Sequence, residues 1–121
     1  ISNAYYPKYQ SWYERNGFGE RDLVDGAWVH GHKLDPFMDF YPAQKEALKA
    51  LWVAINKATG IPLETPKNQF EGNSTKYEQQ VAYGKYSGFV SHYHVSKSKI
   101  DCAGLDIVGL LEEIKEGKGG A

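Results

Sequence analysis

Hydrophobic residues recur at three- and four-residue spacing through the middle of the chain. On a helix this spacing places four apolar side chains on one face: Leu48, Leu51, Trp52 and Ile55. Pro42 fits the first helical turn, because its missing N–H costs no hydrogen bond there, and Gly60 is a frequent helix terminator. The pattern therefore predicts a helix from about Pro42 to Thr59.

A second amphipathic segment lies near the C-terminal end. Between residues 105 and 114 the apolar side chains again share one helical face: Ile107, Leu110, Leu111 and Ile114. Asp106 comes just before them, and the helix dipole favours a carboxylate at a helix N-terminus. This segment is predicted to be a short helix that begins near Asp106.

Strand and loop patterns occupy the rest of the chain. Residues 88–95 are predicted to form a strand, with His92 and His94 on the same side of it. Residues 1–39 are predicted to be irregular, apart from a short strand at residues 27–30. Residues 64–80 are predicted to be a polar loop. The order of these elements indicates an α/β or α+β domain.

Length and charge narrow the classes of function. A chain of 121 residues forms a single domain, expected over residues 1–116, with 117–121 as a flexible tail. Its 14 basic and 15 acidic residues nearly cancel, which argues against electrostatic binding of nucleic acid or an anionic membrane surface. No apolar run approaches the ~20 residues that a membrane helix needs.

The chemically reactive side chains gather in one short stretch. His92, His94, Asp101 and Cys102 supply imidazole, carboxylate and thiolate, the donor types that zinc prefers, and Lys99 adds a positive charge that could stabilise an oxyanion. On these residues alone, a polar strand edge or a hydrogen-bonded core pair is the commoner explanation of two nearby histidines. A lone cysteine is usually a buried apolar residue.

The amino-acid order of residues 89–104 indicates a metal site more specifically than the spacing of its donor residues does. Ser91-His92 and Lys99-Ile100-Asp101 resemble the closing motif of the type-2 N-acetylmuramoyl-L-alanine amidases, a family that includes phage endolysins and peptidoglycan recognition proteins. In that motif a strand ends in a small residue and His, and a loop ends in Lys, one residue, and Asp or Cys. Residues 39–44 are similar to the family's helix entry, and residues 1–3 to the strand after its "Ile-Gly-Ile-Glu" segment.

The resemblance implies a function and a role for each residue. The family's fold is an α/β domain with a mixed β-sheet flanked by helices, and its members use zinc to hydrolyse the amide between N-acetylmuramic acid and L-alanine in peptidoglycan. His92 would be the second His ligand of the zinc, Asp101 the third ligand, with Cys102 as the rival third ligand. Lys99 would stabilise the oxyanion, and His94 would be structural or would support a ligand. The substrate would be the bacterial cell wall.

Two functional residues of the family have no counterpart here. These are the first zinc-binding His and the catalytic Glu, and the remaining histidines, His30 and His32, fall too late in the chain to match that His. The chain is therefore expected to be the C-terminal part of an amidase domain, completed by a separate N-terminal part or another chain. Two alternatives stay open: a non-catalytic module of the same fold that binds peptidoglycan, and a structural domain in which the histidines hold no metal.

Overall fold

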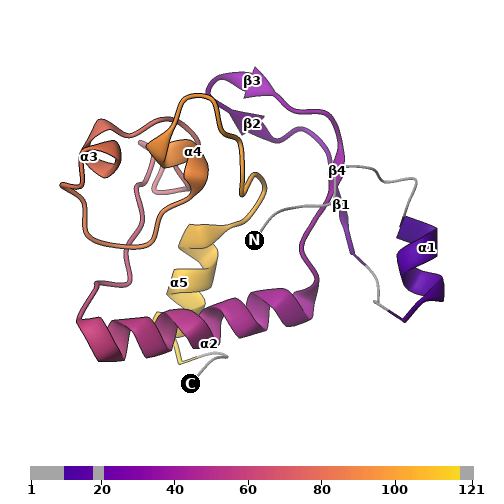
Figure 1. The fold of residues 1–121 in the computed structure, drawn as a ribbon, viewed down its shortest axis with the longest axis horizontal. Helices are drawn as coiled ribbons and strands as arrows, with labels where there is room; N and C mark the ends of the chain where they lie inside the picture. The colour runs from indigo at the N-terminus through magenta and orange to yellow at the C-terminus, as the bar shows by residue number, and fades with distance from the viewer. Residues whose placement is uncertain (1–9, 18–20, 118–121) are drawn as a thin grey trace.

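The computed structural model describes residues 10–17 and 21–117. Two helices form its base, α2 (Pro42–Thr59) and α5 (Ile107–Lys115), with α5 packed against the middle of α2 (Figure 1). Three further helices are short: α1 (Gln10–Arg15), α3 (Gln79–Ala82) and α4 (His92–Val95). The strands are two residues each: β1 (Leu23–Val24), β2 (Trp28–Val29), β3 (His32–Lys33) and β4 (Phe37–Met38).

The strands pair into two small antiparallel sheets. β1 pairs with β4, and β2 pairs with β3 in a hairpin that confirms the strand predicted at residues 27–30. The general mixed α/β class is therefore observed. Within the described residues, however, no sheet has more than two strands, and none mixes parallel with antiparallel pairs.

Helix α2 has the bounds that the sequence predicts. At its start the backbone N–H of Tyr41 donates to the Gln44 side chain at 2.8 Å, and at its end Gly60, in a left-handed conformation, donates to the carbonyl of Asn56 at 2.9 Å. Trp52 is buried, whereas Leu51 is 54% exposed and does not lie on the buried face as predicted. The buried stripe is thus narrower than the sequence pattern suggests.

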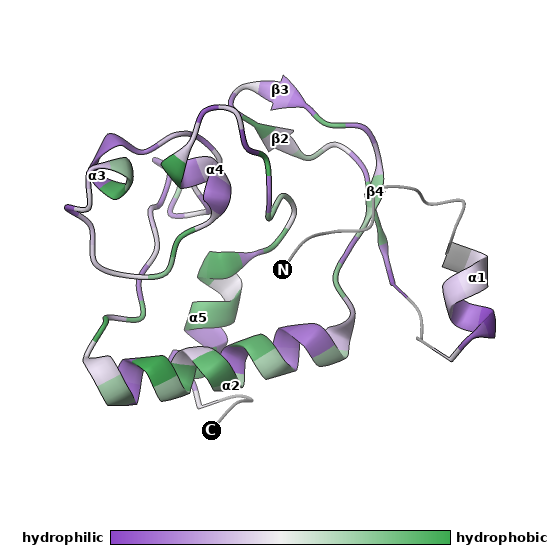
Figure 2. Ribbon diagram, in the orientation of Figure 1, coloured by the Kyte–Doolittle hydropathy of each residue, from purple (hydrophilic) through white to green (hydrophobic). Residues whose placement is uncertain are grey.

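Helix α5 supplies Ile107, Leu110 and Leu111, three of the seven buried residues that form the main hydrophobic core of the described chain, and it is apolar along most of its length (Figure 2). Asp106 caps it as expected, since its carboxylate accepts the backbone N–H of Gly109 at 3.0 Å. The Asn73 side chain donates to Asp106 at 2.7 Å and accepts the backbone N–H of Val108 at 2.9 Å. These bonds attach the long polar loop to the start of α5.

A buried lysine joins the two long helices. Lys49 of α2 forms ion pairs with Glu46 at 2.8 Å and with Glu113 of α5 at 3.2 Å. The hydrogen bond to Glu46 raises the pKa of the Lys49 ammonium, burial opposes this, and Glu113 adds to the increase. The charged group is therefore compensated where α2 and α5 meet.

The strand predicted at residues 88–95 is wrong, because residues 88–91 form no strand and residues 92–95 form the helical turn α4. A strand would place Tyr93 and His94 on opposite faces, but both are almost completely buried, and His92 and Val95 on either side of them are exposed. Tyr93 packs in a second core cluster with Val29 of β2. The helical turn lets Tyr93 and His94 both be buried, and it places His92 at its exposed start.

Some sequence-based expectations fall outside the described residues. These are the match at residues 1–3 and most of the flexible tail, residues 118–121. In the described part of the chain, no helix is both long enough and apolar enough to cross a membrane.

Candidate metal site

The two predicted metal ligands lie side by side. His92 is the first residue of α4, and Asp101 lies in the loop that follows that helix. The imidazole Nδ1 is 3.2 Å from the carboxylate Oδ2, and the two side chains are 47% and 34% exposed. The fold therefore brings together two donor groups nine positions apart and leaves both open to solvent.

Ser91 holds the two ends of this site together. Its hydroxyl donates to the backbone carbonyl of Asp101 at 2.8 Å and accepts the backbone N–H of Cys102 in a short hydrogen bond. The N–H of Tyr93 donates to the same Asp101 carbonyl at 3.1 Å. Three hydrogen bonds thus attach the Asp101–Cys102 peptide to the first turn of α4, which fixes the backbone from which both donors extend.

Replacing Ser91 by Ala is expected to lower the free energy of unfolding by about 1–3 kcal/mol, because the N–H of Cys102 and the carbonyl of Asp101 lose their part-buried hydrogen bonds to the buried Ser91 side chain. The measurement is the urea midpoint. Ser98→Ala in the exposed part of the loop is the matched control and should change stability by less than about 0.5 kcal/mol. Equal midpoints for the two variants would show that Ser91 does not fix the loop.

His94 is fully engaged in hydrogen bonds inside the protein. Its Nδ1 accepts the backbone N–H of Ser91 at 2.9 Å, and its Nε2 lies 2.8 Å from the carbonyl of Ser74. A carbonyl can only accept, so Nε2 carries the hydrogen and the ring is neutral. Burial lowers the pKa of His94. With both nitrogens occupied, His94 has a structural role and no free nitrogen for a metal.

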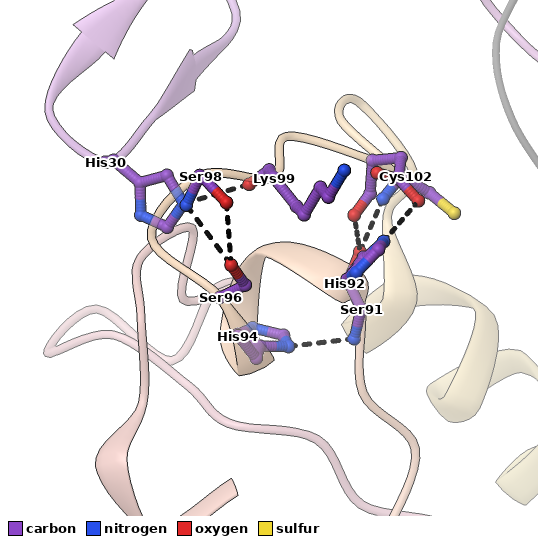
Figure 3. Close-up of polar contacts among 9 residues, drawn as sticks. His30, Ser91, His92, His94, Ser96, Ser98, Lys99 and Cys102 are labelled. Carbon is purple, nitrogen blue, oxygen red and sulfur yellow. Dashed lines mark hydrogen bonds and ion pairs between the residues drawn. The ribbon is translucent and has the colours of Figure 1, made fainter. Parts of the chain in front are cut away.

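Cys102 and Asp101, the rival third ligands, point in different directions. The Cys102 side chain is half-buried against the main core, and in Figure 3 its sulfur points away from His92. Burial raises the pKa of the Cys102 thiol, which disfavours the thiolate that binds metal. Asp101 is the rival whose side chain contacts His92.

Lys99 lies on the exposed loop between α4 and Asp101. Its side chain extends from the His30 side of the loop toward the side where His92 and Cys102 lie (Figure 3). Its backbone carbonyl is 2.9 Å from Nε2 of His30, a residue of the β2–β3 turn. Neither this contact nor the Ser91 contacts were predicted, because no local pattern in the sequence connects these segments.

The His92–Asp101 geometry fits zinc as part of a ligand set. Two ligands on a tetrahedral zinc, each about 2.0–2.2 Å from the metal, lie about 3.3 Å apart. The observed separation of 3.2 Å between Nδ1 and Oδ2 is close to that edge, and it is equally the length of a direct hydrogen bond or ion pair between the two groups. In residues 10–17 and 21–117, no third His, Cys, Asp or Glu joins the pair to form a group of three.

Together the fold and the site define a small mixed α/β domain with a solvent-exposed His–Asp pair. No family model, curated protein or solved structure matches this chain. Any function assigned to it therefore depends on the motif in its sequence and on the contacts described above.

Proposed function

We propose that this chain is part of a zinc-dependent N-acetylmuramoyl-L-alanine amidase of the type-2 family, acting on bacterial cell walls. The observation that supports this most directly is the His92–Asp101 pair, whose donor atoms are separated by 3.2 Å, close to the edge of a zinc tetrahedron. The proposal includes the family's fold, a mixed sheet flanked by helices, in which α2 and α5 would form part of the helical layer.

Each residue of the site has a proposed role. His92 and Asp101 would hold the metal, and Ser91 would keep their backbones in register. When bound, zinc supplies Lewis-acid polarisation of a carbonyl and a lowered pKa for coordinated water. The Lys99 ammonium would stabilise the negative charge that develops on the scissile carbonyl oxygen. A further ligand and a general base would come from outside the described residues.

The test is release of stem peptide from purified peptidoglycan, measured as new α-amino groups of L-alanine. The chain is assayed alone and joined to a family segment that carries the first His and the catalytic Glu. Amines should appear with zinc, stop when a chelator is added, and return when zinc is restored. If zinc is bound and neither form releases amines, the proposal fails.

Within the same assay, Lys99→Met is expected to keep zinc binding and to lower the rate of amine release by about 100-fold or more, because a charge that stabilises the oxyanion is lost. Lys97→Met, two positions earlier on the same loop, is the matched control. Lys97 lies over the Tyr77 ring at 5.1 Å, so its removal should change the rate much less. Equal rates for the two variants would remove Lys99 from the mechanism.

A non-catalytic peptidoglycan-binding module is the second candidate. One observation favours it. In the described part of the chain, His92 and Asp101 lie together as potential zinc ligands and no third His, Cys, Asp or Glu joins them, whereas catalytic zinc normally has three protein ligands. Cosedimentation with insoluble peptidoglycan, without release of amines from either form of the chain, would select this function.

A further inference from the structure

The turn between β2 and β3 has a histidine, His30, at its first central position. His30 and Gly31 both adopt positive φ angles, 54° and 77°, as a two-residue type I′ hairpin requires. Gly adopts this conformation freely, and among the other residues Asn, Asp and His are the ones enriched in it, so the turn accepts His30.

The His30 side chain does make a long-range contact. The ring Nε2 of His30 donates to the carbonyl of Lys99, 69 positions away, at 2.9 Å. The backbone N–H of His30 donates to the carbonyl of Thr75 at 2.8 Å. Because the Lys99 carbonyl can only accept, Nε2 must carry the hydrogen. His30 therefore joins the hairpin to two loops, one of which carries Lys99 (Figure 3).

The other hydrogen bonds at the turn of this loop are local, and the hydroxyls of Ser96 and Ser98 lie 3.0 Å apart. The backbone N–H of Lys99 donates to the carbonyl of Ser96 at 3.3 Å, and that of Ser98 donates to the Ser96 hydroxyl at 3.3 Å. Local bonds of this kind preserve the shape of a turn but do not fix its position on the protein. The imidazole connects the turn to the hairpin, whose Val29 is buried in the second core cluster.

We propose that His30 is a positioning residue, whose imidazole holds the Lys99 carbonyl and so fixes the loop from which the Lys99 side chain extends toward the side where His92 lies (Figure 3). The catalytic consequence rests on the proposed amidase function, whereas the effect on the loop does not. His30 would touch neither substrate nor metal, and it would act through the backbone of Lys99.

The test uses His30→Asn, with His32→Asn of the same hairpin as the matched control. Asn suits the left-handed turn position, so the fold should persist, but its amide cannot take the place of the ring Nε2. Trypsin can cleave after Lys99 when the loop opens. Loss of the hydrogen bond between His30 and the Lys99 carbonyl should raise the population of the open loop about 5-fold, and the rate of cleavage after Lys99 should rise by the same factor. The control should cleave at the wild-type rate. An unchanged rate in His30→Asn, with the fold intact by circular dichroism, overturns the proposal.

A second readout tests the catalytic consequence. In the amine-release assay, His30→Asn should lower kcat about 5- to 10-fold, with KM and zinc content unchanged. If the cleavage rate rises while kcat stays at the wild-type value, the role in positioning Lys99 for catalysis is overturned. If the wild-type chain releases no amines, the amidase function has failed, and the trypsin comparison by itself decides whether His30 holds the loop.

Discussion

Replacing Asp101 by Asn, or His92 by Ala, is expected to weaken zinc binding by at least ~100-fold, since changes beside a metal ligand already cost 10- to 100-fold. Asn keeps the size of the aspartate but removes the charge that a metal ligand supplies. Both side chains are partly exposed, and an exposed ion pair contributes about 1 kcal/mol or less to stability. The fold should therefore persist. Zinc is measured by competition with a chromophoric chelator, and the fold by the urea midpoint.

Two further variants separate the possible ligands in this experiment. His32→Ala removes an exposed histidine of the β2–β3 hairpin and should leave zinc binding unchanged. Cys102→Ser should also retain zinc, because the thiol packs against the main core instead of approaching His92. If Cys102→Ser released the metal and Asp101→Asn kept it, Cys102 would be the ligand and the assignment of Asp101 would be wrong. Full binding by both His92→Ala and Asp101→Asn would mean that no zinc site exists here.

The parts of the fold that were predicted from the sequence are those specified by local signals. Helix α2 has Pro42 at its start, Gly60 at its end and apolar residues at helical spacing between them, so short-range chemistry defines it. Helix α5 likewise has Asp106 as its cap. The two-residue strands have no measurable period, and pairing between distant residues, such as Leu23 with Met38, defines them.

The error at α4 has a tertiary cause. The alternation in residues 88–95 suits a strand, but Ser91 and His94, three positions apart, also form a local cap for a helical turn, in which the backbone N–H of Ser91 donates to the His94 ring. The distant contacts that favour the helical turn are the buried hydrogen bond from His94 to the carbonyl of Ser74, twenty positions away, and the burial of Tyr93 beside Val29. Contacts between such distant segments cannot be inferred from periodicity, so the local pattern gave the wrong structure.

For the candidate site, too, the sequence predicted the residues but not the long-range contacts between them. The motif identified His92, Lys99 and Asp101 as candidates, but it did not show that the first and last of these would be in contact. That contact depends on the Ser91 hydroxyl bridging to the Asp101–Cys102 peptide. The role of His30 was missed because it depends on a hydrogen bond across 69 positions. Residue identities were thus available from the sequence, whereas the contacts that position them required the fold.

The second large effect is expected at His94. Replacing it by Ala would leave the backbone N–H of Ser91 and the carbonyl of Ser74 buried without their partner and would open a cavity beside Tyr93. The expected loss is about 3–5 kcal/mol of unfolding free energy, a large fraction of the total for a domain of this size. His94→Gln keeps more of the volume and one donor, so its loss should be smaller. The measurement is urea unfolding at pH 7.5.

His94 should also make stability depend on pH. Burial lowers its pKa below the ordinary 6.5, with a smaller contribution from His30, while the Ser74 carbonyl and Glu78 oppose the change. Below pH 6.5 the His94 side chain binds a proton in the unfolded chain but stays neutral in the folded protein until the pH reaches its lower folded pKa. Stability is therefore fully present above pH 6.5 and declines as the pH falls toward the folded pKa, by at most about 1.4 kcal/mol per pH unit. Urea midpoints between pH 7.5 and 5 should show this decline in the wild type and in the control His32→Gln, and a weaker one in His94→Gln. A decline of equal slope in His94→Gln would mean that another group titrates, and that the buried His94 hydrogen bonds do not control stability in this range.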